Sequence, residues 1–334
     1  MLVVLAIFVG IFAFINQDKL IDRFIEGQAR DAMQIDLLDD KNVFRLITVG
    51  TAAPIPSERA QTCNVIIANG KMFIFDLGEG SLDMLEDLRL PFIQTSEVFI
   101  SHWHSDHFID LPGYINRSWQ MGRSKPLTVY GPKGINQIID GIDNLLDIEN
   151  KHRIAHHGAN IMDPSIALAS GVPLSTDPGS QIVYSDGEVL ITATQVNHDP
   201  VELSYAYRID FRERSVVLSG DCSYDERLVS FAQGADILVH EAMQKDFIKR
   251  GSELMKEMGN DRNAKILSDV LDYHATPQEA ATVAQQAGVK KLILSHLAPV
   301  PENPISRRFF KRGLGDIYNG PIVLADDGDE HLIE

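Results

Sequence analysis

Short apolar runs typical of β-strands recur along the chain from Val43 onward. The first group comprises VFRLITVG, NVIIA, MFIFD, EVFISH and LTVYGP, in that order. A second group, EVLITATQV, YAYRIDF, SVVLSG, ILVHEA and KLILSH, fills much of the second half of the sequence. The pattern predicts a β-strand in each of these runs.

Helical patterns lie between these runs. SLDMLEDL follows Gly80, a second helix is expected over 111–121, and INQIIDGIDNLL follows the strand LTVYGP. The last helix is the best marked, because Thr276 to Glu279 form a capping box with Pro277 at the first helical position. Gly288 is expected to end that helix.

This order of elements indicates the α/β class. Strands come first and then mix with helices, which suits a four-layer αββα sandwich, although periodicity alone does not name a fold. We expect one domain over 42–334, with no linker inside it. Within the domain, residues 145–176 are predicted to be a loop-rich insertion that covers a site and carries His152, His156 and His157.

The N-terminal segment differs from the rest of the chain. Residues 1–15 form an uncharged apolar run. As a helix it would span roughly 22 Å, which is short against a bilayer core of about 30 Å. A buried N-terminal helix is less favoured, because the run has no polar face. We therefore expect 1–41 to be an export signal or membrane anchor followed by a connector, and the protein to be exported or membrane-anchored.

Composition narrows the class of partner. The chain has 47 acidic and 30 basic residues, for a formal charge of −17. Such a chain repels phosphate backbones at long range, and we find no basic stripe of the kind that nucleic-acid binders carry. Cys63 and Cys222 are expected to be buried thiols rather than a disulfide, since nothing in the sequence brings them together.

The strongest chemical signal is the segment Ser101 to His107, SHWHSDH, which directly follows an apolar strand. Alternation along an extended chain points His102 and His104 the same way, and Asp106 and His107 come where the chain turns toward a helix. Neutral imidazole suits zinc, and a carboxylate compensates charge. One loop could therefore supply two adjacent metal ions.

Here the chain resembles the metallo-β-lactamase superfamily, whose signature is His-x-His-x-Asp-His. The resemblance covers most of 45–300. The glycine-containing turns at 50–54 and 76–80 look like the family's first turn and its Asp-x-Gly-x-Gly turn. His198, Asp221 and His296, each after a strand-like run, match its later metal-binding motifs.

The resemblance implies a site with two zinc ions, with manganese or iron as alternatives. One ion would be held by His102, His104 and His198, the other by Asp106, His107 and His296, and Asp221 would bridge both. Such a site activates water for hydrolysis, with Asp106 orienting the hydroxide. Oxygen-reducing members of the superfamily tend to carry glutamate at the second histidine, whereas His104 is retained here.

Two further motifs resemble the ribonuclease Z branch and related phosphodiesterases. His240-Glu241-Ala242 is similar to that branch's His-Glu-Ala-Thr, with Met243 in place of threonine, and 274–276 is similar to its His-Ser-Thr. The resemblance implies that His240, Glu241 and His274 are catalytic and assist protonation of the leaving alkoxide. The alternative is that Glu241 lies on the surface and His274 only neighbours a helix cap.

One departure from that branch bears on the substrate. Many ribonuclease Z enzymes carry a long tRNA-gripping arm between the third motif and the bridging aspartate, but here only 23 positions separate His198 from Asp221. The missing arm and the negative charge both disfavour tRNA. We therefore predict a zinc hydrolase of a phosphodiester or similar ester. A lactonase or arylsulfatase is the first alternative, and a non-catalytic metal-bearing module the second.

The sequence leaves alternatives open for the substrate contacts and for the oligomeric state. Trp103 inside the metal loop could line the pocket or pack beneath the loop. His156 and His157 could contact substrate or lie in an exposed loop. Members of the family often form homodimers, which the resemblance leaves open for this chain.

Overall fold

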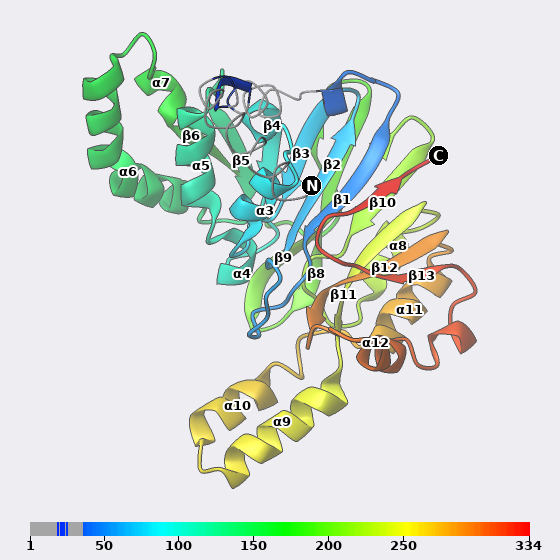
Figure 1. The fold of residues 1–334 in the computed structure, drawn as a ribbon. Helices are drawn as coiled ribbons and strands as arrows, with labels where there is room; N and C mark the ends of the chain where they lie inside the picture. Colours follow the sequence, from blue (N-terminus) through cyan, green and yellow to red (C-terminus); the bar gives the residue numbers. More distant parts are fainter. Residues whose placement is uncertain (1–18, 20, 24, 26–35) are drawn as a thin grey trace, which may run out of the picture.

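The computed structural model describes residues 19, 21–23, 25 and 36–334. In this part of the chain, two seven-stranded sheets pack face to face, with helices on their outer faces (Figure 1). The strand order is β14-β1-β2-β3-β4-β5-β6 in the first sheet and β13-β12-β11-β10-β9-β8-β7 in the second. The predicted αββα sandwich is confirmed.

Ten of the fourteen strands follow the predicted apolar runs closely, whereas the four edge strands β6, β7, β13 and β14 were not predicted. The first sheet contains β1 (Phe44–Gly50), β2 (Cys63–Ala68), β3 (Lys71–Phe75), β4 (Thr95–Phe99), β5 (Leu127–Gly131), β6 (Ala169–Pro173) and β14 (Asp329–Leu332). The second contains β7 (Gln181–Ser185), β8 (Val189–His198), β9 (Val201–Phe211), β10 (Arg214–Leu218), β11 (Ile237–Met243), β12 (Lys291–Ala298) and β13 (Ile322–Leu324).

The helices form the two outer layers and a projection. The first sheet carries α3 (Ser81–Asp87), α4 (Ser105–Phe108), α5 (Leu111–Gln120), α6 (Ile135–His157) and α7 (Pro164–Ala167). The second half of the chain contributes α8 (Glu226–Phe231), α9 (Lys245–Glu257), α10 (Asp261–Asp269), α11 (Pro277–Gln286) and α12 (Pro304–Phe310). Short 3-10 turns occupy Asp36–Leu38, Phe92–Gln94 and Leu314–Asp316.

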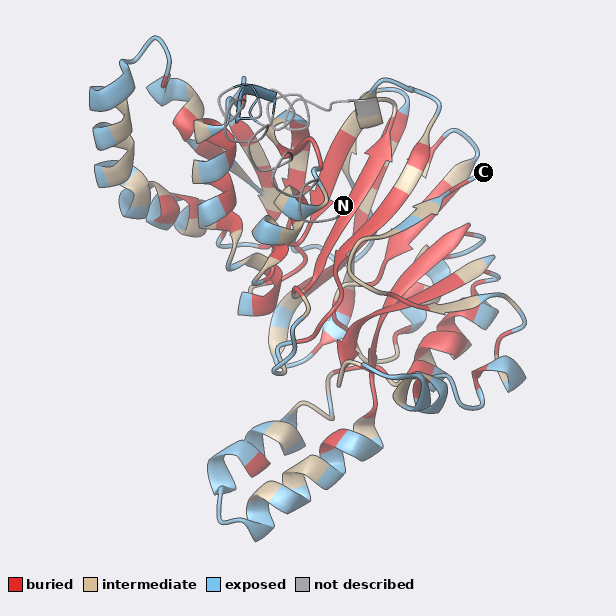
Figure 2. Ribbon diagram, in the orientation of Figure 1, coloured by how far each residue is buried: buried red, intermediate tan, exposed pale blue. Residues whose placement is uncertain are grey.

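Side-chain alternation along the strands separates three apolar layers. In β2, Ile66 and Ala68 face the second sheet, whereas Val65 and Ile67 face the helices α3, α5 and α6. A third layer lies between the second sheet and α8 and α11. Strands buried on both faces read as continuous apolar runs, which is why the sequence pattern located them well (Figure 2).

The capping box before α11 is formed as predicted. The Glu279 amide donates to Thr276 Oγ1 at 3.1 Å, and the Thr276 amide donates to Glu279 Oε2 at 2.7 Å. The helix ends at Gln286, and Gly288 adopts a positive φ of 62° two residues later. Cys63 and Cys222 are both free and buried, which confirms the expectation of two thiols.

The predicted loop-rich insertion over 145–176 is wrong. Its first thirteen residues continue α6 to His157, and α7 and β6 occupy much of the rest. Helical ion pairs four residues apart, Lys151–Asp147 and Arg153–Glu149, support this outer half of α6, and no glycine or proline interrupts it before Gly158. The high content of polar residues indicated a solvent-exposed helix rather than a loop.

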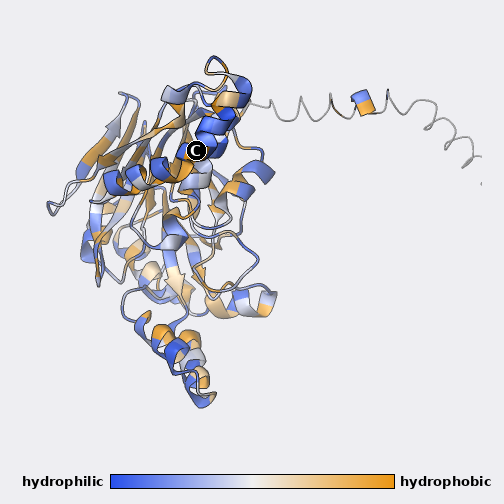
Figure 3. Cartoon of the chain, turned by 90° about the vertical axis from the view of Figure 1, so that its left-hand side faces the viewer, coloured by the Kyte–Doolittle hydropathy of each residue, from blue (hydrophilic) through white to orange (hydrophobic). Residues whose placement is uncertain are grey.

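The helical hairpin α9–α10 was not anticipated from the sequence. It projects from the lower edge of the sandwich in Figure 1. Its base packs on Ala53 through Ile248 and Leu267. Along its length it exposes apolar side chains, including Phe247, Leu254 and Met258. Orange positions are visible on this projection in Figure 3.

The apolar N-terminal run lies outside the described residues, so the signal or anchor assigned to 1–41 stays a prediction. Among the residues that the structure does describe, no helix is both long and apolar enough to cross a membrane.

Candidate metal centre

The histidine-rich segment lies where β4 gives way to α4. Ser101 and His102 directly follow the strand, and His104, in extended conformation, precedes the first turn of α4. Asp106 and His107 lie within that turn, so their side chains reach the same space from the helix side. All but His104 are buried, and His104 is partly exposed.

A first group of donors gathers around His104. His104 Nδ1 lies 3.0 Å from His102 Nε2 and 3.3 Å from His198 Nε2. Asp221 Oδ2 lies 3.9 Å from His102 Nε2 and 4.0 Å from His198 Nε2. One donor atom from each of these four residues falls within 4.8 Å of all the others, which is the spacing of ligands around a single ion.

A second group shares Asp221 with the first. His296 Nε2 lies 3.0 Å from Asp106 Oδ2 and 3.2 Å from Asp221 Oδ2. His107 Nε2 lies 3.3 Å from Asp221 Oδ2 and 3.5 Å from Asp106 Oδ2. The structure thus brings together all seven residues that the sequence analysis nominated as ligands, in the two predicted groups.

Irregular backbone delivers two of these residues to the site. Gly220, directly before Asp221, has a φ of +60°, and a Cβ there would lie 2.5 Å from the Tyr205 carbonyl oxygen. His296 is the extra residue of a bulge in β12, since Ser295 pairs with Glu241 and Leu297 with Ala242. Its φ of 47° is strained for a residue with a side chain, and the bulge directs its ring toward Asp221.

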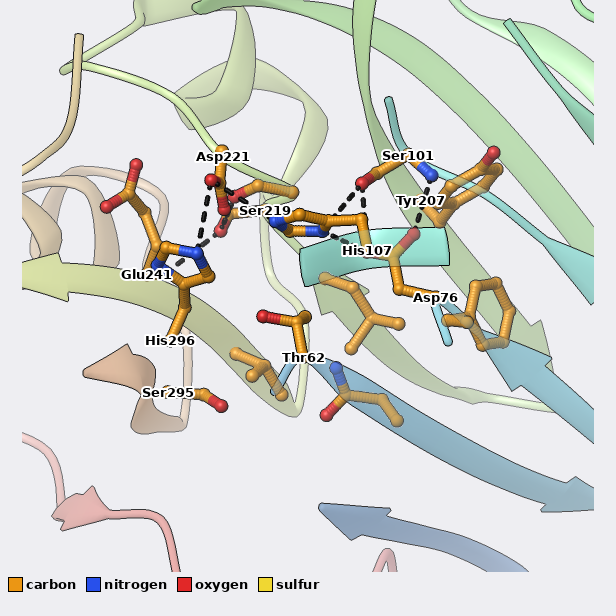
Figure 4. Close-up of a pocket in the computed structure, with 15 residues that line it drawn as sticks. Thr62, Asp76, Ser101, His107, Tyr207, Ser219, Asp221, Glu241, Ser295 and His296 are labelled. Carbon is orange, nitrogen blue, oxygen red and sulfur yellow. Dashed lines mark hydrogen bonds and ion pairs between the residues drawn. The ribbon is translucent and has the colours of Figure 1, made fainter. Parts of the chain in front are cut away.

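A network of hydrogen bonds orients the imidazole rings (Figure 4). Asp76 Oδ2 lies 2.8 Å from His107 Nδ1 and accepts a bond of 2.8 Å from Ser101 Oγ. The Ser101 amide donates to Asp76 Oδ1 at 2.7 Å. His198 Nδ1 lies 2.9 Å from the Tyr273 carbonyl oxygen. These contacts leave the Nε2 atoms of His107 and His198 facing the centre. In metal sites, a hydrogen bond at the other ring nitrogen commonly orients a ligating histidine in this way.

The surroundings shift the pKa values of the histidines in two opposite directions. Burial lowers the pKa of His102, His104 and His198, so these rings are neutral near pH 7. Burial also acts to lower the pKa of His296, but the carboxylates of Asp221 and Asp106 raise it to about 9. The pKa of Asp221 is held well below its usual range, because His296 and His107 outweigh the effect of burial.

These properties fit a divalent cation. His107 Nε2 is buried without a hydrogen-bond partner among the described residues, although it faces two carboxylates. Five imidazoles and two carboxylates also form a donor set that suits zinc and related metals. The cluster is therefore a candidate centre for two ions, with Asp221 common to both groups.

The second predicted motif pair also meets at this centre. His274 Nδ1 lies 2.9 and 3.0 Å from the two carboxylate oxygens of Glu241, and the Cys222 amide donates to Glu241 Oε1 at 2.8 Å. Both side chains are buried, so Glu241 is not a surface residue. Together with His296, this pair forms a third group of donors within 4.8 Å of one another.

His240 does not join the cluster. Alternation along β11 places Glu241 on the inner face, with Val239, and His240 on the outer face, with Leu238. Its Nδ1 lies 2.8 Å from the Glu241 carbonyl oxygen. The structure therefore separates His240 from Glu241 and His274, with which the motif had grouped it.

The predicted substrate residues fall in two different places. Trp103 lines a groove beside His104 with Lys133 and Leu203. Its indole N–H donates to the Lys133 carbonyl at 3.1 Å, and its ring meets Phe108 edge-on, so it both packs and faces the groove. His156 and His157 are exposed at the outer end of α6, roughly 30 Å of helix away from the Trp103 end.

Ser101 and Tyr273 were missed by the sequence analysis. Ser101 ties Asp76 to two of the histidines, and Tyr273 acts through its backbone carbonyl. A single serine beside a histidine motif carries no signal of its own, and a carbonyl contact leaves none in the side chain. Asp76 was indicated only through the turn that resembled the family.

Comparisons with known proteins agree with this geometry. Residues 88–297 match the family model described as Beta-lactamase superfamily domain. A protein named Ribonuclease Z from Mycolicibacterium gilvum is 30% identical over 255 residues, which cover 75% of this chain and 83% of that protein. A protein of the same name from Mycobacterium marinum is 29% identical over 267 residues, covering 77% and 87%.

Solved structures share the fold. The short form of human tRNase Z superimposes with a TM-score of 0.62 at 24% identity, over 87% of this chain and 99% of that chain. The metallo-beta-lactamase fold protein YhfI from Bacillus subtilis gives the same TM-score and coverage at 21% identity. The chain belongs to the beta-lactamase superfamily, and it is a metal-dependent hydrolase.

Proposed function

We propose that this protein is a two-zinc phosphodiesterase that cleaves RNA. The observation that carries the proposal is the pair of donor groups that share Asp221. His102, His104 and His198 would hold one ion, and Asp106, His107 and His296 the other. The curated relatives named Ribonuclease Z support a nucleic-acid ester as the substrate.

The residues of the site have separate tasks in this proposal. Zinc held by these residues would supply hydroxide near neutral pH and would stabilise negative charge on the phosphoryl group. Asp106 accepts a hydrogen bond at the attacking oxygen and so orients it. Asp76, through His107, keeps the rings of the site in one orientation and one tautomer.

Glu241 and His274 are suited to protonate the leaving group. Because His274 Nδ1 faces the Glu241 carboxylate, its Nε2 is the nitrogen that can carry a proton to a leaving alkoxide. The contact with Glu241 fixes the direction of the His274 ring. Burial of both side chains keeps bulk water from taking the place of the acid.

A small diester is the second candidate substrate. The strands β9 and β10 are joined by a tight turn at Arg212 and Glu213, so the region between His198 and Asp221 has no arm that could grip a folded RNA. This turn and the charge of −17 favour a substrate with few phosphates. The two candidates use the same chemistry and differ in what lies beyond the scissile bond.

The test is hydrolysis of a chromogenic phosphodiester and of a single-stranded RNA by the zinc-loaded protein. We expect both substrates to be cleaved, activity to disappear with a chelator, and zinc to restore it. Cleavage of the chromogenic diester alone would select the small-diester alternative. A protein that contains two zinc ions per chain and cleaves neither substrate would contradict the proposal and direct attention to lactones and sulfate esters.

A further inference from the structure

A dense basic cluster lies on α12, in a chain that is otherwise strongly acidic. Between Asn303 and Gly315 there are four cationic residues and no acidic one, and all four fall within six positions, RRFFKR at 307–312. No other six-residue stretch of the sequence carries four cations. The sequence has no long basic stripe, but it does carry this compact patch.

The side chains of two of the four cations have no partner among the described residues. Arg307 forms an ion pair with Asp326 at 2.7 Å, and Lys311 Nζ donates to the Ile322 carbonyl at 2.7 Å. Within the described part of the chain, the side chains of Arg308 and Arg312 have no hydrogen-bond or ion-pair partner, and both residues are exposed. A pair of unpaired guanidinium groups is available for an anion.

Apolar side chains accompany these arginines. Ile305 is 82% exposed and Phe309 is 48% exposed. With Arg308, Lys311 and Arg312 they line one shallow hollow. Cationic groups around an exposed aromatic ring match single-stranded RNA, because phosphates pair with the cations and bases stack on the ring.

The patch lies at the end of the sandwich that carries the candidate metal centre. Helix α12 begins eight residues after His296, and the Phe310 carbonyl accepts from Gln244 Nε2, just after the end of β11, at 3.4 Å. In Figure 1, α12 lies beside α11 near the lower ends of the strands, on the side where β11 and β12 end. An RNA held there would extend along the same edge as the scissile site.

We propose that the α12 patch, formed by Ile305, Arg308, Phe309, Lys311 and Arg312, binds the backbone of an RNA substrate away from the metal centre. This rests on the proposed function and deepens it. The patch would supply the local positive charge that the chain as a whole lacks, without an arm between β9 and β10.

The test compares two double variants with the full-length wild-type protein. Arg308→Gln with Arg312→Gln removes the free cations, and Lys151→Gln with Arg153→Gln removes the same charge from the outer half of α6. Binding of a fluorescent 2′-O-methyl single-stranded RNA is followed by anisotropy at several salt concentrations, and hydrolysis of a chromogenic diester is followed in parallel. Because binding is measured without turnover, a failure of the proposed function does not hide the result.

We expect the α12 variant to bind RNA about tenfold more weakly, with the slope of log K against log salt reduced by about 1.4, since each single-strand phosphate contact contributes about 0.7. Diester hydrolysis and the control variant should match the wild type. Equal RNA binding by both variants would overturn the proposal. Loss of binding to vesicles of phosphatidylserine with RNA binding unchanged would also overturn it, and would assign the patch to a lipid surface.

A separate observation concerns the second nitrogen of His296. Thr62 Oγ1, Asn64 Oδ1, Ser295 Oγ and His296 Nδ1 are buried without hydrogen-bond partners among the described residues. All four residues line one internal cavity of about 30 Å³ (Figure 4 labels Thr62, Ser295 and His296). A polar cavity of this size holds a water molecule when several polar groups face it.

We infer that a buried water links His296 Nδ1 to Asn64, which makes Asn64 a positioning residue. Because His296 Nε2 faces Asp106 and Asp221, its Nδ1 carries the proton when the ring binds a metal. That N–H needs an acceptor, and the orphaned Asn64 carbonyl oxygen provides one through the water. The rings of His102, His107 and His198 have direct partners in Ser101, Asp76 and the Tyr273 carbonyl.

The test is zinc affinity by chelator competition, with Asn64→Leu and the conservative Asn64→Asp. We expect zinc affinity at the site that contains His296 to fall ten- to a hundredfold in the leucine variant and to recover for the most part in the aspartate variant. Unchanged zinc affinity in the leucine variant would overturn the inference. If that variant fails to fold, a high-resolution crystal structure of the wild type decides: a water within hydrogen-bond distance of both atoms supports it, and a dry cavity refutes it.

Discussion

The two halves of the sandwich supply the candidate metal centre in different ways. The first half delivers His102, His104, Asp106 and His107 from a single stretch at the end of β4. The second half delivers His198, Asp221 and His296 from three separate strand ends spread over 99 positions. A local motif in one half can therefore indicate a site, but the fold of the other half has to complete it.

Removing one ligand from each half tests whether both halves are needed for the metal centre. His104→Ala and His198→Ala should each lower kcat/KM on a phosphodiester on the order of a thousandfold or more, since metal binding contributes several kcal/mol to transition-state stabilisation. Steady-state kinetics and metal analysis measure both effects. His152→Ala, an exposed histidine on α6, is the matched control and should behave as the wild type.

Full activity with unchanged metal content in either ligand variant would contradict the shared centre. Loss in His104→Ala alone would show that the first half suffices and that His198 is a bystander.

A second comparison separates ligands from the proposed acid. His274→Ala and Glu241→Gln should lower kcat by about a hundred- to ten-thousandfold, the range of general acid catalysis, while two metal ions remain bound. Metal analysis of the purified variants distinguishes the roles. An emptied site in His274→Ala would instead assign the third donor group, Glu241, His274 and His296, to metal binding.

The third prediction concerns Asp76, which orients the histidine-rich segment of the first half. Asp76→Asn weakens the contact to His107 Nδ1 and places an amide nitrogen where Ser101 now donates. We expect zinc affinity to fall ten- to a hundredfold, with a smaller effect on overall folding. Chelator competition measures the affinity. A variant with wild-type affinity would show that the ring of His107 is held by packing alone.

The smallest effect on stability is expected at an ion pair that joins the two halves. Lys71 Nζ on β3 lies 2.5 Å from Asp186 Oδ2 in the turn between β7 and β8. The bond from Lys71, with two backbone amides, outweighs burial and lowers the pKa of Asp186 to about 2. Because the pair is partly exposed, Asp186→Asn should cost less than about 1 kcal/mol at pH 7.

The pH dependence of this effect has a definite sign. A carboxyl group with a lowered pKa stabilises the fold above its ordinary value near 4 and loses that contribution as pH falls through 2. Urea unfolding of wild type and variant should therefore give a difference that is constant from pH 7 to 5 and shrinks below pH 4. A difference that grows on acidification would rule out this carboxylate as its source.

The sequence predicted the ten inner strands, because residues buried on both faces leave continuous apolar runs such as Val65 to Ile67. It missed the four edge strands β6, β7, β13 and β14, whose side chains are largely exposed or only partly buried. It failed where polar residues dominate: the outer half of α6 was taken for a loop, and the hairpin α9–α10 was overlooked. The seven proposed ligands could be nominated through motif order, yet their meeting depends on the β12 bulge at His296, which no local pattern indicates. His240 was grouped with Glu241 because a motif does not record which face of a strand each residue occupies.

The two halves together are expected to bind two metal ions, one on each side of Asp221. The most direct measurement is anomalous diffraction from crystals of the zinc-loaded protein. We predict two peaks, one bordered by His102, His104 and His198 and the other by Asp106, His107 and His296, each within bonding distance of Asp221. A single peak, or a peak between Glu241, His274 and His296, would contradict a two-ion centre shared by the two halves.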